Sequence, residues 1–250
     1  MNADNRYAIT PMKRVATVLC LLTVMALLSG CLYPQDRKVQ NQVSTKEAVR
    51  LVQGAIDQYF EDKSMLPIKN ALSETPIYEK FLIDFQKLQR SGYLSSIPTA
   101  AFENGGNYYF IIIDEENSRQ VKLLDIVTTQ RINDIQSWVK EYTQSNVGKL
   151  PLGNELYEGF YMIDYKAMNK KEPEIRSVFS GQTLQAMVDQ NGVVYTDYGL
   201  DLMQLIQQGD AANIKPEQDI RELLTDSSDM VPVKSPVYHW LNNEPQAVIP

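Results

Sequence analysis

Apolar residues recur every three to four positions over residues 44–62, which is the spacing of one face of an α-helix. Ser44 and Glu47 form a capping box, in which each side chain accepts a hydrogen bond from a backbone N–H that the first helical turn leaves unpaired. We therefore expect a helix that begins at Ser44, ends near Asp62 and is followed by a turn at Leu66-Pro67. The apolar face consists of Ala48, Val49, Val52, Ala55, Ile56, Tyr59 and Phe60.

A different pattern, rich in aromatic and β-branched residues, occupies residues 107–113 (NYYFIII) after Gly105-Gly106. Residues 121–124 (VKLL) resume an apolar run after the polar segment 114–119. Two such runs separated by a short polar segment predict an antiparallel hairpin. A shorter helix is expected to begin at Phe85.

The second half of the chain repeats the order of the first. Leu150-Pro151 and Ile163-Asp164 follow Leu66-Pro67 and Ile83-Asp84 by 84 and 80 positions. This order predicts an internal duplication, while chance recurrence in a Tyr-rich chain is the alternative. The expected fold class is α+β, with two tandem units that each pack a helix on a small antiparallel sheet.

The other elements of the second unit also follow this order. A helical stripe over residues 132–142 precedes Leu150-Pro151, as the stripe over 44–62 precedes Leu66-Pro67. A strand pattern at 191–198 stands in the place of residues 106–113. A helix over 200–207 is expected to close the unit.

The N-terminal region carries a signal for export. Lys13 and Arg14 precede an uncharged run of 14 residues, 15–28, which is too short to span a bilayer as a permanent helix. The run ends at Leu28-Ser29-Gly30-Cys31, which resembles the lipobox of bacterial lipoproteins. An uncleaved signal anchor and a secreted protein in which Cys31 is incidental are the alternatives.

The lipobox resemblance implies cleavage between Gly30 and Cys31 and a diacylglyceryl group, such as one bearing palmitate, on the Cys31 thiol. Two acyl chains would hold the protein on a membrane, where one chain would bind only reversibly. We expect a lipoprotein signal peptide at 1–30, a lipidated tether at 31–43, one α+β unit at 44–127, a second at 128–208, and a short helix opened by Pro216 with an extended Pro-containing tail at 209–250.

Charge and cysteine content exclude several kinds of partner and site. The chain has a net charge of −7, and removal of residues 1–30 takes away three basic residues and one acidic residue, which gives −9. Such a protein repels nucleic acid and anionic head groups, so no nucleic acid partner is expected. Cys20 is lost with the signal peptide and Cys31 is acylated, which excludes disulfides and thiol catalysis in the folded part.

Carboxylates are the remaining candidates for catalysis. Asp84 and Asp164 occupy matching positions in the two units and could serve as acid and base on a wall glycan. The alternative is that each aspartate caps the turn or short helix that follows it. The single histidine, His239, lies in the tail, where a packing or surface role is favoured.

The sequence indicates no cofactor and no metal site. Gly105-Gly106 lacks the further glycine and the lysine of a phosphate-binding loop. Residues 114–118 (DEENS) lack the spacing of a calcium loop and are expected to form a solvated hairpin turn.

Short motifs of the chain resemble two known families. Residues 48–113 look like the globular part of a type IV pilin or pseudopilin, through Leu66-Pro67, Tyr93-Leu94, Ile97-Pro98 and Gly105-Gly106-Asn107-Tyr108-Tyr109, which implies pseudopilin-like units. The chain departs from that family where assembly is encoded, because a lipobox replaces the prepilin site and no long apolar stem follows. The whole chain also resembles an uncharacterised lipoprotein family of Bacillus-type Gram-positive bacteria, through Gly30-Cys31-Leu32-Tyr33-Pro34-Gln35-Asp36, Leu66-Pro67-Ile68-Lys69-Asn70 and Val121-Lys122-Leu123-Leu124-Asp125. This resemblance implies a lipid-anchored protein on the outer face of the cytoplasmic membrane.

We therefore expect a non-enzymatic binding or scaffold module of the cell envelope that is anchored to the membrane through Cys31. Its expected partner is an envelope protein or a wall polymer. The alternatives are a carboxylate-dependent wall glycan hydrolase that uses Asp84 and Asp164, and a solute-binding receptor.

Overall fold

The computed structural model of the protein describes residues 36–209 and 214–249. The chain divides into two units, residues 1–43 and 44–250, and the contacts given below lie within the second. The predicted signal peptide, Gly30 and Cys31 lie outside the described residues. Within the described residues, no helix is long and apolar enough to cross a membrane.

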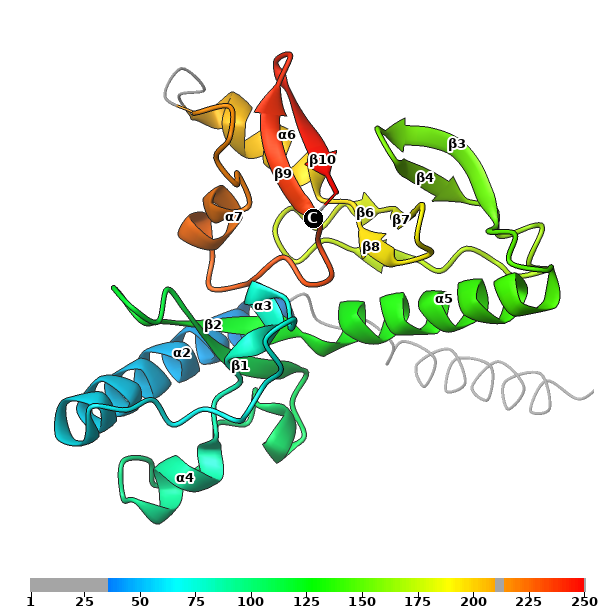
Figure 1. Ribbon diagram of the computed structural model, residues 1–250. Coiled ribbons are helices and arrows are strands. Elements are labelled where there is room, and N and C mark those ends of the chain that lie inside the picture. The colour runs from blue at the N-terminus through cyan, green and yellow to red at the C-terminus, as the bar shows by residue number, and fades with distance from the viewer. Residues whose placement is uncertain (1–35, 210–213, 250) are drawn as a thin grey trace, which may run out of the picture. The chain divides into compact units, whose positions relative to one another are not determined.

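The fold is α+β, as the sequence predicts, with several small antiparallel sheets (Figure 1). The helices are α2 (Asp36–Lys63), α3 (Ile77–Lys80), α4 (Phe85–Arg90), α5 (Ile126–Ser145), α6 (Gly199–Gln208) and α7 (Glu222–Ser227). The strands are β1 (Tyr108–Ile113), β2 (Gln120–Asp125), β3 (Leu152–Tyr157), β4 (Phe160–Ile163), β5 (Ile175–Arg176), β6 (Thr183–Leu184), β7 (Ala186–Asp189), β8 (Val194–Thr196), β9 (Val237–Leu241) and β10 (Glu244–Val248).

The first half packs α2 against the β1–β2 hairpin (Figure 1). The hairpin is antiparallel and pairs Phe110 with Leu123, which confirms the predicted strands. Val52 and Ile56 of α2 are fully buried in the same core as these two strand residues. The predicted helix at Phe85 is also present, as α4.

Helix α2 begins at Asp36, eight positions before the predicted start at Ser44. The predicted N-cap at Ser44 is therefore wrong, because Ser44 lies inside the helix. Residues 36–43 (DRKVQNQV) contain no glycine or proline, and Lys, Arg and Gln are good helix formers, so the helix extends through them. The predicted end near Asp62 is confirmed, since the helix ends at Lys63.

The second half is built on a four-stranded sheet in the order β3-β4-β7-β8, with α5 packed against it. Its core contains residues of α5, of the sheet and of α6. Fully or nearly fully buried members of this core include Ile132, Ile135, Phe160, Met187, Val188 and Leu202.

A glutamine on each long helix makes the same pair of hydrogen bonds to a strand. In each half the side-chain amide donates to a carbonyl just before the strand, and its oxygen accepts from the backbone N–H of the strand residue two positions further on. The bonds are Gln53 Nε2 to Arg119 O (2.9 Å), Val121 N to Gln53 Oε1 (2.7 Å), Gln136 Nε2 to Gly192 O (2.8 Å) and Val194 N to Gln136 Oε1 (2.9 Å). A duplication predicts such repeated contacts, although the duplication itself stays a prediction.

These contacts place β8 in the position of β2. The sequence pattern pairs residues 191–198 with 106–113, whereas the glutamine contacts pair Val194 with Val121. The preceding strands agree, because β1 pairs Ile112 with Val121 and β7 pairs Val188 with Val194. Strand β7 therefore corresponds to β1, one strand earlier than the sequence pattern indicates.

The C-terminal tail differs from the predicted extended segment. The predicted short helix is present as α7, but it begins at Glu222 instead of at Pro216. Residues 216–221 form turns, and Ile220 N donates to Tyr238 O (2.9 Å) instead of to a helical carbonyl. The chain then ends in the antiparallel hairpin β9–β10. Asn242 and Asn243 connect its strands with φ of 54° and 63°, and asparagine tolerates this left-handed backbone better than most residues.

The same tail contacts both halves. Leu123 N donates to Asp229 O (2.8 Å) and Val231 N donates to Leu123 O (3.0 Å), so the tail adds a short parallel bridge to β2. Thr196 N of β8 donates to Lys234 O (2.8 Å) a few residues later. Val231 is buried in a small core with side chains of α3, β1 and β2.

Candidate functional site

The two candidate catalytic aspartates each cap a local turn. Asp84 is the N-cap of α4, and its Oδ1 accepts from Lys87 N (3.0 Å). Asp164 Oδ1 accepts from Ala167 N (3.0 Å), which is the same spacing of three residues. The capping role that the sequence allowed is therefore present at both positions, and each carboxylate bonds within its own turn.

Their backbones also occupy equivalent positions. Asp84 N donates to Pro67 O (2.7 Å) and Asp164 N donates to Pro151 O (2.9 Å). Each Leu-Pro step is thus held beside an Ile-Asp step. Their recurrence in the sequence has a structural reason, which is a shared backbone contact and a shared cap.

The acidic segment after β1 forms the predicted hairpin turn. Asp114 accepts hydrogen bonds from Ser118 Oγ (2.6 Å), Asn117 Nδ2 (2.7 Å) and Ser118 N (3.0 Å). The Ser118 hydroxyl, followed by the Asn117 amide, lowers the pKa of the exposed Asp114 carboxyl. In the described ranges, no group of three or more His, Cys, Asp or Glu side chains is arranged to hold a metal ion.

His239 lies on β9, opposite Gln246 of β10, and is half-buried. Its neighbour Tyr238 is fully buried, as expected for the alternation of side chains along a strand. His239 therefore has the packing or surface position that the sequence favoured, on the strand pair β9–β10.

A buried polar network at the start of α6 was not indicated by the sequence. Asp197 Oδ1 accepts from Tyr238 Oη (2.7 Å), Gly199 N (2.9 Å) and Tyr157 Oη (3.0 Å). Burial, followed by the nearby Asp197 charge, raises the pKa of both tyrosines. The network joins β3, β9 and α6, so it fastens the terminal hairpin to the second half.

Asp201, in the first turn of α6, is a buried carboxylate with one unpaired oxygen. Its Oδ2 accepts from Ser177 Oγ (2.8 Å), while Oδ1 has no hydrogen-bond partner. Burial is the main cause that raises the pKa of Asp201 above the usual value of 3.8, and the Asp197 charge adds to it. The folded state therefore binds a proton at this group more tightly than the unfolded state does.

Asp201→Asn is expected to change how stability depends on pH. In the wild-type protein, the stabilising protonation of Asp201 is complete below pH 3.8 and is lost as the pH rises through the raised pKa. The asparagine has no such loss, so the variant should gain stability relative to wild type as the pH rises from 3.8 through the raised pKa of Asp201. Urea unfolding at several pH values measures this difference.

Asp114→Asn provides a control of opposite sign. Because hydrogen bonds lower the pKa of Asp114, its ionised form favours the folded state, and the asparagine variant should lose stability relative to wild type as the pH rises. Parallel pH profiles for wild type and Asp201→Asn would contradict the role given to the buried carboxylate.

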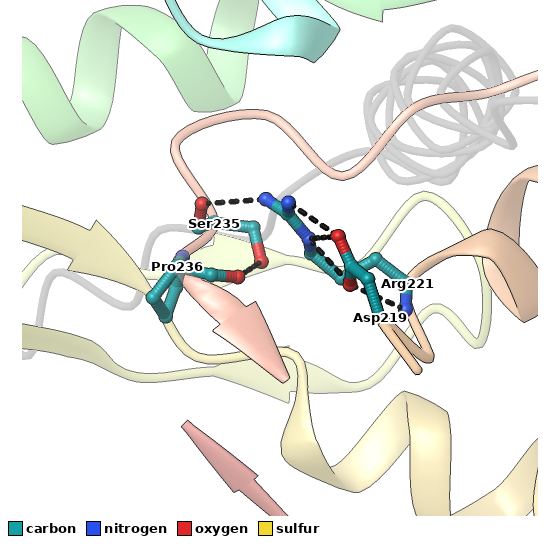
Figure 2. Close-up of polar contacts among 4 residues, drawn as sticks. All are labelled: Asp219, Arg221, Ser235 and Pro236. Carbon is teal, nitrogen blue, oxygen red and sulfur yellow. Dashed lines mark hydrogen bonds and ion pairs between the residues drawn. The ribbon is translucent and has the colours of Figure 1, made fainter. Parts of the chain in front are cut away.

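Arg221 makes the densest set of polar contacts in the tail (Figure 2). Its side chain is 8% exposed, and its guanidinium binds Asp219 through Nε (2.9 Å) and Nη2 (2.6 Å). Nη1 donates to Ser235 O (3.1 Å), and the guanidinium carbon lies 5.0 Å from the ring centroid of Tyr78 on α3. Burial raises the pKa of Tyr78 to about 12, although Arg221 opposes this shift. These contacts hold the tail together.

A shallow pocket of about 330 Å³, open to solvent, lies between the first turns of α5 and strand β5. Asp125, the N-cap of α5, uses its Oδ2 to accept from Thr128 N (2.8 Å). The lining combines charged side chains with the apolar residues Val127 and Ile175. Its lining residues are Asp125, Val127, Thr128, Arg131, Glu174, Ile175 and Arg176.

The two arginines of this pocket differ in their pairing. Arg176 binds Glu174 through Nη2 (2.8 Å) and Nε (2.9 Å), and both side chains are well exposed, at 70% and 60%. Arg131 is exposed, and within the described residues its guanidinium makes no ion pair. An exposed ion pair contributes about 0–1 kcal/mol, so an incoming anion can compete for Arg176 as well as for Arg131. The sequence did not indicate this pocket, because its two arginines are 45 positions apart.

Comparison with protein families found a match to part of the first half. Residues 45–125, about a third of the chain, match the YphF family N-terminal domain, a description that names no activity. The matched region ends at Asp125, the last residue of β2 and the N-cap of α5. Neither the curated proteins nor the solved structures gave a match to this chain.

Proposed function

We propose that the protein is a lipid-anchored, extracytoplasmic lipoprotein that acts as a binding or scaffold module in the cell envelope. The observation that carries this proposal is the pocket at α5 and β5, whose exposed arginines are available to a ligand while Asp84 and Asp164 are engaged as caps. A binding role needs such exposed groups, whereas a two-carboxylate hydrolase needs carboxyl groups free to meet a glycosidic bond.

The anchor is part of the same proposal. The lipobox at Leu28-Ser29-Gly30-Cys31 supports attachment through Cys31, and the net charge of −7 disfavours attachment through a basic surface instead. The likenesses to a Bacillus-type lipoprotein family and to pilin globular modules favour an envelope protein or a wall polymer as partner. Both resemblances rest on sequence motifs.

In-cell crosslinking of the wild-type protein and a Cys31→Ala variant tests this proposal. We expect the wild-type protein to carry lipid on Cys31 and to have specific crosslinked partners, and the variant to lack both the lipid and those partners. Purified protein incubated with wall glycan is expected to release no fragments. The proposal fails if wild type carries no lipid on Cys31, if Cys31→Ala keeps the same partners, or if glycan is released and Asp84→Asn and Asp164→Asn each abolish that release.

A further inference from the structure

We infer that the pocket between α5 and β5 binds the phosphate ester group of a polyol phosphate polymer. The choice of an envelope polymer as the ligand rests on the proposed function. The choice of a phosphate group rests on the residues that line the pocket. Its lining brings Arg131 and Arg176 to the same opening from two different elements.

Two guanidinium groups suit a phosphate better than a carboxylate. A guanidinium presents a planar fork of N–H donors that can bind two oxygens of one anion. One such fork already satisfies a carboxylate here, since Nη2 and Nε of Arg176 both bind Glu174. A phosphate ester has more oxygens at wider angles, so it can receive a second fork, and Arg131 is the group left to supply it.

The other lining groups set how the ligand would sit. The Asp125 carboxylate caps α5, because it accepts a hydrogen bond from Thr128 N. The Glu174 side chain is 60% exposed, so it can turn away from Arg176 into solvent. Val127 is 52% exposed and offers an apolar edge for the carbons of a polyol. The pocket opens to solvent. One phosphate of a polymer could therefore bind in the pocket while the neighbouring repeat units of the polymer stay in solvent, which an enclosed cavity would not allow.

The charges of the pocket set what a phosphate must displace. A protein of net charge −7 repels phosphate over most of its surface, and the lining balances its two arginines with Asp125 and Glu174. Binding therefore depends on Arg131 and on the exchange of Glu174 for the phosphate at Arg176. The interaction should weaken as salt is added, because the arginines are exposed.

Titration of the purified protein with glycerol phosphate, followed by NMR or calorimetry, tests the inference. Arg131→Gln and Arg176→Gln are each expected to weaken binding about tenfold, since each removes one charge-assisted contact to the phosphate. Arg50→Gln is the matched control, because Arg50 is an exposed arginine of α2 outside the pocket and its loss changes the net charge equally. This control should bind as wild type does.

Absence of binding by the wild-type protein, or equal weakening by Arg50→Gln, would overturn the inference. The source of the phosphate is tested with Cys31→Ala protein, which lacks the anchor: an oligomer of glycerol phosphate should bind, and phosphatidylglycerol vesicles should not. Vesicle binding that needs both arginines, without oligomer binding, would overturn the polymer assignment. Because these titrations use no crosslinking and test only phosphate, the phosphate assignment can fail while the membrane-anchored binding role stands.

Discussion

Replacing Phe110 or Phe160 by alanine is expected to destabilise the protein by about 3–5 kcal/mol in each case. Phe110 is 1% exposed in the core of the first half, where its ring meets Phe85 edge to face at 5.3 Å. Phe160 is fully buried in the core of the second half, where it meets Tyr195 at 5.6 Å. Each truncation removes a full aromatic side chain and leaves a cavity that the surrounding β-sheet cannot close.

Both variants should lower the midpoint of one shared unfolding transition. The reason is that the tail bonds to β2 and to β8, so loss of either core removes support from the other. Urea unfolding followed by far-UV circular dichroism and by tryptophan fluorescence measures this coupling. Phe102→Ala is the control, since Phe102 is 51% exposed, and it should cost less than about 1 kcal/mol. Two separate transitions, one shifted by each variant, would show that the halves unfold independently.

Arg221→Ala is expected to cost about 2–3 kcal/mol, as urea unfolding would measure. The substitution leaves the Asp219 carboxylate and the Ser235 carbonyl without their donor and removes the guanidinium from the ring of Tyr78. Breaking a buried ion pair costs about 3–5 kcal/mol, and we expect less here because Asp219 is 28% exposed and can regain water.

Arg176→Ala provides a matched comparison for this prediction. Arg176 binds Glu174 two positions earlier, as Arg221 binds Asp219, but this pair is exposed at 70% and 60%. Its loss should therefore change the free energy of unfolding by less than about 1 kcal/mol. Equal effects of the two substitutions in urea unfolding would contradict the importance of burial for Arg221.

The sequence predicted well those elements whose pattern comes from local periodicity. The helix that ends at Lys63 and the hairpin of β1 and β2 each bury one regular face, and the period of that face is visible along the chain. The start of the first helix was harder to place. Helix α2 begins at Asp36 because polar residues with high helix propensity can extend a helix without showing any apolar stripe.

The candidate site was also harder to predict. Asp84 and Asp164 were found because they recur, and recurrence cannot separate a repeated cap from a repeated catalytic group. The pocket depends instead on Arg131 and Arg176, which belong to different elements and form no motif. The buried Asp201 likewise looks like an ordinary helix-start aspartate until its surroundings are known.

The sequence by itself determined the α+β class, the main helices and the first hairpin, since these follow from which side chains must leave water. It also predicts an export signal, because the residues that such a signal needs are adjacent in the chain and end in Cys31. Only the tertiary structure decided where the tail goes, because the partners of Leu123 and Thr196 lie more than 35 residues away and are chosen by sheet edges with unpaired backbone groups. For the same reason, only the fold could bring two distant arginines to one pocket.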